Sequence, residues 1–111
     1  MNTDYTDRES YVATPFKIFF NKELSVSAIR VWQVIFSHYN WRDEECFPSL
    51  DTIIKESRKS KNTVLDARKK LREKGLMDWT VHKCRSGVLC YYTFPVEDLF
   101  PAEMLNRLGV R

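Results

Sequence analysis

The sequence has little glycine, little cysteine and no long apolar run, and each shortage excludes a class of protein. Only three of the 111 residues are glycine, which is too few for a glycine-rich loop that binds phosphate. The three cysteines are an odd number and lack the dense spacing of a disulfide framework, so we expect a reducing, cytoplasmic setting. No apolar run approaches the roughly 18 residues of a membrane span, and the polar start MNTDYTDRES is not a signal peptide.

The chain does contain enough apolar side chains for one folded domain. Hydrophobic residues make up 43% of the sequence and aromatic residues 14%, which is sufficient to bury a core. The length also fits a single domain. We expect a flexible tail over residues 1–14, a globular domain over residues 15–95 and an amphipathic extension over residues 96–111.

Positive charge is concentrated in one part of the chain. Residues 55–85 contain eleven Lys or Arg and four Asp or Glu, so this segment carries +7, and the chain's total of +3 leaves −4 for the rest. A basic segment on an acidic body is typical of a nucleic-acid-binding protein. The alternative is a solvated, lysine-rich helix face.

Caps and apolar periodicity predict three helices. The first begins at Ser25 or Ser27, with Ser25 as its N-cap, and runs to Trp41. The second is short, with Ser49 as its N-cap, and covers residues 50 to about 56. Ser60 caps the third, over residues 61–74, and Gly75 follows where a left-handed residue is wanted. The segment PFKIFFNKEL before the first helix is expected to be a short strand or irregular, with its aromatic residues on the core (Phe16, Phe19 and Phe20).

After Gly75 the apolar period changes from 3.6 to 2, which predicts a β-hairpin. The turn is CRSG, so the basic residues Lys83 and Arg85 lie at its tip. The residues expected on the inward face are Met77, Trp79, Val81, Val88, Cys90, Tyr92 and Phe94. After the hairpin, an amphipathic piece carries Leu99, Phe100, Met104, Leu105 and Leu108. It either packs on the domain or forms a homodimer contact.

Three helices followed by a basic hairpin is the order of a winged helix-turn-helix, an α+β fold. Residues 16–94 also resemble the helix-turn-helix domains of phage and plasmid replication initiators and of small regulators of mobile elements. In that family FPS opens the second helix, S-x-x-T-V opens the recognition helix and L-x-x-K-G-L closes it. The matching residues are Phe47, Pro48, Ser49, Ser60, Thr63, Val64, Leu71, Lys74, Gly75 and Leu76.

Two departures from the family's pattern stand close together. The second helix has Ile53 and Ile54 where a small LA pair is usual, and the turn has Ser57 and Arg58 in place of a glycine. We therefore expect a turn that is looser or shifted by one residue. The resemblance implies a DNA-binding protein of a plasmid, phage or conjugative element.

The third helix predicts how DNA would be read. Residues near the start of a recognition helix meet base edges in the major groove, which is about 12 Å wide. The predicted base-reading residues are Lys61, Asn62, Leu65, Asp66 and Lys69. For Asp66, base reading and repulsion of phosphate are equally weighted. The predicted DNA-backbone contacts are Ser49, Arg58, Lys59, Ser60, Lys70, Arg72, Lys83, Arg85 and Ser86.

Other chemistry finds less support. His82, Cys84 and Cys90 invite a zinc site, with Cys46 as a distant fourth ligand, but the strand alternation points them to different faces. Tyr91 faces outward and stays open as a nucleic-acid contact. No catalytic set emerges, so we expect neither an enzyme nor a cofactor, metal or small-molecule ligand.

Three roles remain for the predicted DNA-binding domain. A transcriptional or transfer regulator would occupy an operator, whereas a replication initiator or accessory factor would bind an origin. The chain is too short for a separate helicase-recruiting domain, which favours a regulator or an accessory factor. The third role is a winged helix used only for protein–protein interaction.

Overall fold

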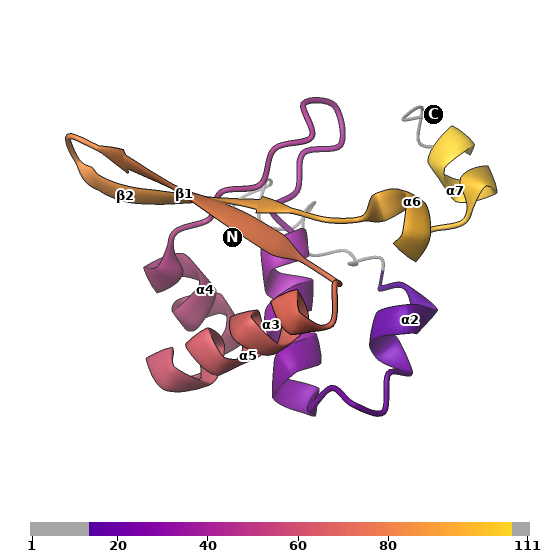
Figure 1. Ribbon diagram of the computed structural model, residues 1–111, viewed down its shortest axis with the longest axis horizontal. Coiled ribbons are helices and arrows are strands. Elements are labelled where there is room, and N and C mark those ends of the chain that lie inside the picture. Colours follow the sequence, from indigo (N-terminus) through magenta and orange to yellow (C-terminus); the bar gives the residue numbers. More distant parts are fainter. Residues whose placement is uncertain (1–13, 108–111) are drawn as a thin grey trace, which may run out of the picture.

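The computed structural model describes residues 14–107, so the predicted tail lies outside the described residues except for Thr14. A helical body carries one long hairpin (Figure 1). The elements in chain order are α2 (Phe16–Phe19), α3 (Val26–Phe36), α4 (Leu50–Ser57), α5 (Lys61–Glu73), β1 (Asp78–Cys84), β2 (Gly87–Thr93), α6 (Val96–Leu99) and α7 (Ala102–Arg107). The strands are antiparallel, with a register running from Asp78 opposite Thr93 to Cys84 opposite Gly87. This is the predicted α+β winged helix-turn-helix.

Three serines start the three main helices as the sequence predicts. The side chains of Ser25, Ser49 and Ser60 accept hydrogen bonds from the backbone N–H groups three residues on, at 3.0, 3.1 and 3.2 Å. Each bond satisfies one of the amides that a helix leaves unpaired at its start, which is typically worth about 1 kcal/mol. The starts of α3, α4 and α5 are therefore confirmed.

The end predicted for the first helix is wrong, because α3 stops at Phe36 and not at Trp41. The Ser37 amide still bonds to the carbonyl four residues back, but the amides of His38 and Tyr39 bond to carbonyls three residues back, which tightens and ends the helix. The chain then turns so that the rings of Tyr39 and Trp41 lie 5.2 and 5.6 Å from the ring of Phe36. In a continued helix Trp41, five residues after Phe36, would lie on a different face, so the contact between these two rings requires the helix to end before Trp41.

The turn between α4 and α5 is closed by hydrogen bonds, so of the two expectations, a looser turn or one shifted by a residue, the looser turn is wrong. Arg58 takes the left-handed conformation that a glycine would normally supply, with φ 60° and ψ 32°. Its backbone N–H donates to the carbonyl of Ile54 at 3.1 Å. The buried hydroxyl of Ser57 accepts from the N–H of Lys59 at 3.3 Å and so closes the turn from inside.

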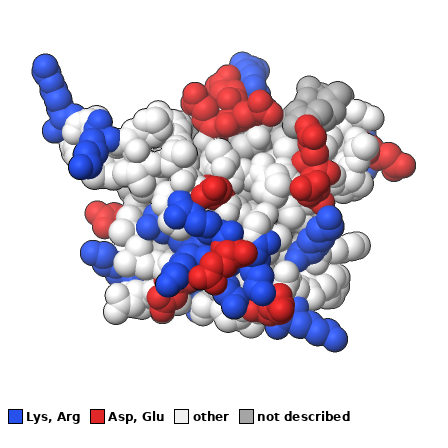
Figure 2. All heavy atoms as spheres, viewed as in Figure 1, with Lys and Arg blue, Asp and Glu red and all other residues white. Residues whose placement is uncertain are grey.

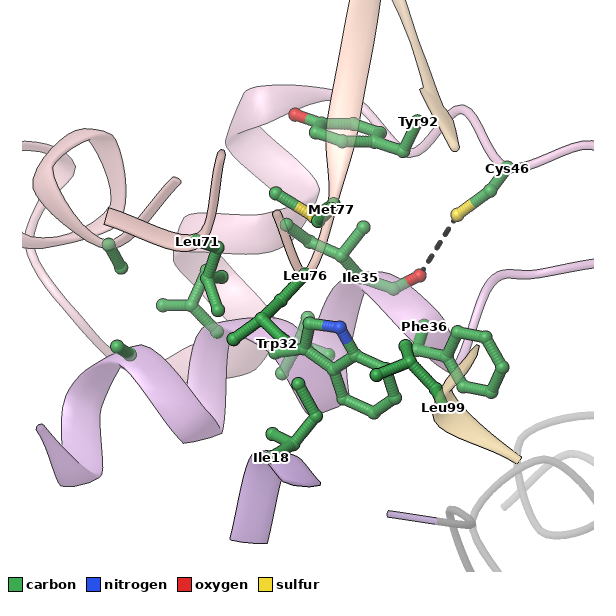
Figure 3. Close-up of a cluster of buried hydrophobic side chains, with 14 of the residues drawn as sticks. Ile18, Trp32, Ile35, Phe36, Cys46, Leu71, Leu76, Met77, Tyr92 and Leu99 are labelled. Atoms are coloured by element: carbon green, nitrogen blue, oxygen red, sulfur yellow. Dashed lines mark hydrogen bonds between the residues drawn. The ribbon is translucent and has the colours of Figure 1, made fainter. Parts of the chain in front are cut away.

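The core lies where α3 crosses α5 and is closed by both ends of the described chain. Trp32 is fully buried in it, with Ile18 on one side and Leu76 on the other (Figure 3). The C-terminal segment supplies Leu99, Phe100 and Leu105, all buried. Of the two predicted alternatives, packing on the domain therefore describes these three residues, while Leu108 lies outside the described part of the chain.

The inward face of the hairpin is buried only at its base. Tyr92 is 1% exposed, but Val81 is 55% and Val88 64% exposed, so the expectation that these two valines point into the core is wrong. The register places Val81 opposite Cys90 and Val88 opposite Lys83, towards the turn. The hairpin extends past the helical body (Figure 1), so none of the described helices lies beneath its outer half to bury them.

The prediction for the segment before α3 is also wrong. It is the single helical turn α2, neither a strand nor irregular, and it buries Ile18. Phe16, Phe19 and Phe20, predicted to pack on the core, are exposed and pack on one another at ring distances of 5.5 and 4.9 Å. Phe16, Phe19 and Phe20 are spaced i, i+3 and i+4 and so share one side of the turn, and Ile18 lies on the other, so burying Ile18 turns the three rings outward. In the described part of the chain no helix is both long and apolar enough to cross a bilayer.

Candidate nucleic-acid interface

Helix α5 buries one face and leaves the other free. Val64, Ala67 and Leu71 are buried, as their spacing along a 3.6-residue helix requires. Four of the five predicted base-reading residues are exposed and the fifth, Leu65, is partly buried; the exposed ones are Lys61, Asn62, Asp66 and Lys69. The start of α5 and the hairpin turn lie on the same side of the molecule, opposite α2, α6 and α7 (Figure 1).

The start of α5 combines free amides with basic side chains. Ser60 caps the helix through the Thr63 amide, and its hydroxyl also donates to the Thr63 hydroxyl at 2.9 Å. Arg58 is exposed and Lys59 is half-buried directly before this cap. A helix start of this kind favours an anion, because its dipole and unpaired N–H groups both point at it.

The hairpin turn places two further cations at the molecule's edge. Lys83, Arg85 and Ser86 are all exposed. The Ser86 hydroxyl lies 3.3 Å from the Cys84 thiol, and hydrogen bonds from the side chain and backbone of Ser86 lower the pKa of that thiol. Basic side chains gather at this tip and over α5, whereas acidic ones gather on the loop between α3 and α4 (Figure 2).

The two flanks of α5 differ in what they contact. Asp66 and Lys70 lie on the flank towards α3, where they line a shallow groove with Ser25, Ser27 and Thr63. Asp66 therefore stands beside the α3 start and not at the centre of the outward face. Ser49 is exposed but serves as the α4 cap, and its hydroxyl lies 2.8 Å from the Thr52 hydroxyl.

On the opposite flank, Arg72 is held by the hairpin. Its Nε lies 2.7 Å from the Asp78 carboxylate, and its Nη2 donates to the Trp79 carbonyl at 2.9 Å. Arg68, one turn earlier, donates to the Tyr92 hydroxyl at 2.8 Å. The sequence reasoning missed Arg68, Asp78 and Trp79 as a group. The four-residue spacing of the two arginines, before a strand with an inward tryptophan, was the available signal.

Several ionisable groups of this region are shifted by their surroundings. The Trp79 N–H and the Arg72 guanidinium hold the pKa of Asp78 below its ordinary value. Burial raises the pKa of Tyr92, against the opposing effect of Arg68. Burial also raises the pKa of the Cys46 thiol to about 12, and this thiol donates to the Ile35 carbonyl at 3.1 Å (Figure 3).

The residues weighed for zinc do not lie together. Within residues 14–107 no three His, Cys, Asp or Glu side chains are grouped as metal ligands. The predicted outward direction of Tyr91 is consistent with its neighbours, since its ring lies 4.9 Å from His82 and 5.4 Å from the half-exposed Phe47.

Comparisons with known proteins agree with the fold. A family model described as a helix-turn-helix domain matches residues 22–77. A solved structure titled "N-Terminal domain of DNA binding protein" is similar at a TM-score of 0.60 and 15% identity, covering 98% of this chain and 91% of the other. Another solved structure, titled "Structure of Rep-DNA complex", is similar at a TM-score of 0.57 and 15% identity, covering 98% of this chain and 92% of the other. Among curated proteins, none is similar enough in sequence to count as a relative.

Proposed function

The chain belongs to the helix-turn-helix domain family, and from this premise we propose that it binds duplex DNA. Helix α5 would enter the major groove, and the hairpin would act as a wing on the DNA backbone. The fold of two similar structures whose titles name DNA supports the same proposal. We propose binding and no catalysis.

The observation that carries the proposal is the shared exposure of the α5 start and the hairpin tip. Lys61, Asn62 and Lys69 are exposed on α5, and Lys83 and Arg85 are exposed at the tip. The start of α5 and the hairpin turn lie on the side of the molecule away from α2, α6 and α7 (Figure 1). We propose that one duplex contacts both surfaces.

Two groups of residues would divide the work. Side chains on the outward face of α5 would choose the sequence, with Asn62 suited to adenine and Lys61 or Lys69 to guanine. Leu65, partly buried, would offer apolar contact to a thymine methyl. The cations around them would neutralise phosphates and supply affinity on any sequence (Arg58, Lys59, Lys70, Lys83 and Arg85). Ser60 and Ser86 would add hydroxyl contacts, whereas Ser49 would act chiefly as a helix cap.

Salt titration tests the proposal directly. We expect the logarithm of affinity to fall steeply and linearly with the logarithm of salt concentration, because several phosphates release counterions. Fluorescence anisotropy on a mixed-sequence duplex would measure it. A flat dependence, or no binding, would rule out DNA as the partner and leave the protein-interaction role.

Two substitutions separate the two groups of residues. Arg85→Ala should weaken every duplex alike and lower the salt slope by about 1. Asn62→Ala should lose roughly 1–3 kcal/mol on the preferred site only. Arg107→Ala is the matched control, since Arg107 is exposed on α7 at the far side of the body. If Asn62→Ala weakened all sequences equally, Asn62 would not read a base.

The biological role we propose is a transcriptional or transfer regulator of a plasmid, phage or conjugative element. A replication initiator or accessory factor is the second candidate, favoured by the similar structure titled "Structure of Rep-DNA complex". Footprinting on the protein's own element would separate them: a regulator protects a promoter region, whereas an initiator protects repeated sites in an origin.

A homodimer through the C-terminal segment also remains a proposal. Two copies would bind half-sites spaced by whole turns of the duplex. Selection of bound sequences from a random duplex pool would return a palindrome if the protein binds as a symmetric dimer, and a single half-site if it does not.

A further inference from the structure

We infer that Arg68 and Arg72 are positioning residues that fix the angle between α5 and the hairpin by holding Trp79. This inference rests on the proposed DNA binding, and it assigns Arg72 a different task from the phosphate contact that its position on the helix predicts. In this view the two arginines act on DNA through the wing and do not themselves touch it.

Arg72 makes three contacts to two adjacent residues of β1. Its guanidinium carbon lies 3.3 Å from the centre of a Trp79 ring, which is direct stacking. Its Nε pairs with Asp78 at 2.7 Å and its Nη2 donates to the Trp79 carbonyl at 2.9 Å. The planar, multiply bonded guanidinium is therefore oriented by stacking and by hydrogen bonds together, a geometry that lysine cannot reproduce.

Arg68 reaches the second strand from the same flank of α5. Its Nη1 donates to the Tyr92 hydroxyl at 2.8 Å, and its guanidinium carbon lies 4.7 Å from a Trp79 ring centre. Trp79 and Tyr92 face each other across the strand register. The two arginines, four residues apart, thus hold both strands at the base of the hairpin.

The burial of Arg68 has a free-energy cost. The Arg68 Nε is buried with no hydrogen-bond partner, which is unfavourable for a charged group. Stacking against aromatic rings offsets part of that cost. A leucine or methionine would fill the same space without burying a charge, so sterics alone do not account for the arginine. A requirement for a fixed hairpin orientation does account for the arginine. The directional hydrogen bond to Tyr92 sets that orientation, and apolar packing would not.

The length of the hairpin makes its angle matter. From Trp79 to the end of β1 at Cys84 there are five residues, a lever of about 17 Å at roughly 3.3 Å per residue. A tilt of about 15° at the base would move the tip by about 4 Å, further than the whole length of a hydrogen bond. Within residues 14–107 the inward face of the outer half is exposed at Val81 and Val88, so the contacts at the base of the hairpin set where Lys83 and Arg85 arrive.

The test asks whether the wing tip still contributes once the base is loosened. Arg85→Ala is introduced into the wild type, into Arg72→Gln and into Asp78→Asn, and affinity for one duplex is measured at one salt concentration. In the wild type we expect Arg85→Ala to weaken binding about fivefold. In the Arg72→Gln and Asp78→Asn backgrounds we expect Arg85→Ala to weaken binding less than twofold, because the displaced tip no longer meets the phosphate. Arg107→Gln is the charge-matched control background, where the fivefold loss should persist.

Asp78→Asn gives the sharper result, because two ideas predict opposite signs. Removing a negative charge should tighten binding to every duplex if Asp78 acts only by repulsion. If Asp78 holds Arg72 in place, the Arg85 contribution is lost. Arg72→Lys, which keeps the charge, should not restore that contribution. Undiminished fivefold losses in both backgrounds, or rescue by Arg72→Lys, would overturn the inference.

A measurement on the free protein keeps this inference separate from the proposed function. Residual dipolar couplings of the backbone amides report the angle between α5 and the hairpin without any DNA. We expect Asp78→Asn and Arg72→Gln to change that angle, or to average it, while the couplings within α5 stay the same. An unchanged angle would overturn the positioning role, whereas failure of the wild type to bind DNA would overturn only the proposed function.

Discussion

The inner and outer halves of the hairpin have the same alternation of apolar residues but very different surroundings. At the base, Trp79 and Tyr92 are opposite one another, and Tyr92 is buried and bonded to Arg68. Farther out, Val81 and Val88 occupy the same face and are exposed. Alternation says which residues share a face, and it does not say whether anything lies against that face. In this protein the base is packed against the helical body, whereas the outer half is exposed to solvent.

The comparison is tested most strongly by shortening one side chain in each half. Tyr92→Ala should lower the free energy of unfolding by about 3–5 kcal/mol, because it removes a buried ring and the partner of a buried guanidinium. Val88→Ala should change it by no more than about 0.5 kcal/mol. Urea unfolding followed by circular dichroism measures both. Similar losses in the two variants would mean that the outer half packs on something after all.

A smaller effect is expected at the turn between α4 and α5, which resembles the outer half in being exposed and basic. Arg58→Gly should stabilise the protein by about 0.5–1 kcal/mol, because glycine takes the left-handed conformation without a Cβ clash. The same change should weaken DNA binding by removing a cation beside the α5 start. Gly75, which already has a φ of 71°, offers the reverse control: Gly75→Ala should destabilise without altering the salt slope. If Arg58→Gly lowered stability, the arginine side chain would have a packing role.

Sequence patterns predicted the elements whose causes are local. The three serine caps, the glycine after α5 and the period change into the hairpin each depend on a few neighbouring residues, and all three appear in the structure. The predictions that are wrong concern features whose structure depends on a segment distant in the sequence. The end of α3 depends on aromatic packing with Trp41, and the exposure of Val81 and Val88 depends on how far the helical body extends. The sequence predicted a core position for Phe16, Phe19 and Phe20, because nothing local shows that a single helical turn will direct Ile18 inward.

In the candidate site, too, the features set by local sequence could be predicted and those set by distant residues could not. The exposed positions of Lys61, Asn62 and Lys69 follow from helical periodicity, so the sequence alone could place them. The contacts of Arg72 could not be predicted by counting along α5, because Asp78 and Trp79 come from the next element and their approach depends on the hairpin's angle. A basic residue on a recognition helix is thus ambiguous until its neighbours in space are known.

The smallest expected effect is on the acid stability of the hairpin base. The pKa of Asp78 is lowered in the folded protein, first by the Trp79 N–H and then by Arg72. The carboxylate therefore stabilises the fold above its ordinary pKa of 3.8, and this contribution is lost as pH falls through the lowered folded value. Because the Asp78 side chain is 67% exposed, solvent screens the interaction and the effect should be slight. Urea midpoints for the wild type and Asp78→Asn should differ at pH 6 and converge as the pH falls below that ordinary value. A difference that persisted in acid would mean that the amide perturbs packing at the base, and that the carboxylate's charge is not what holds Arg72 there.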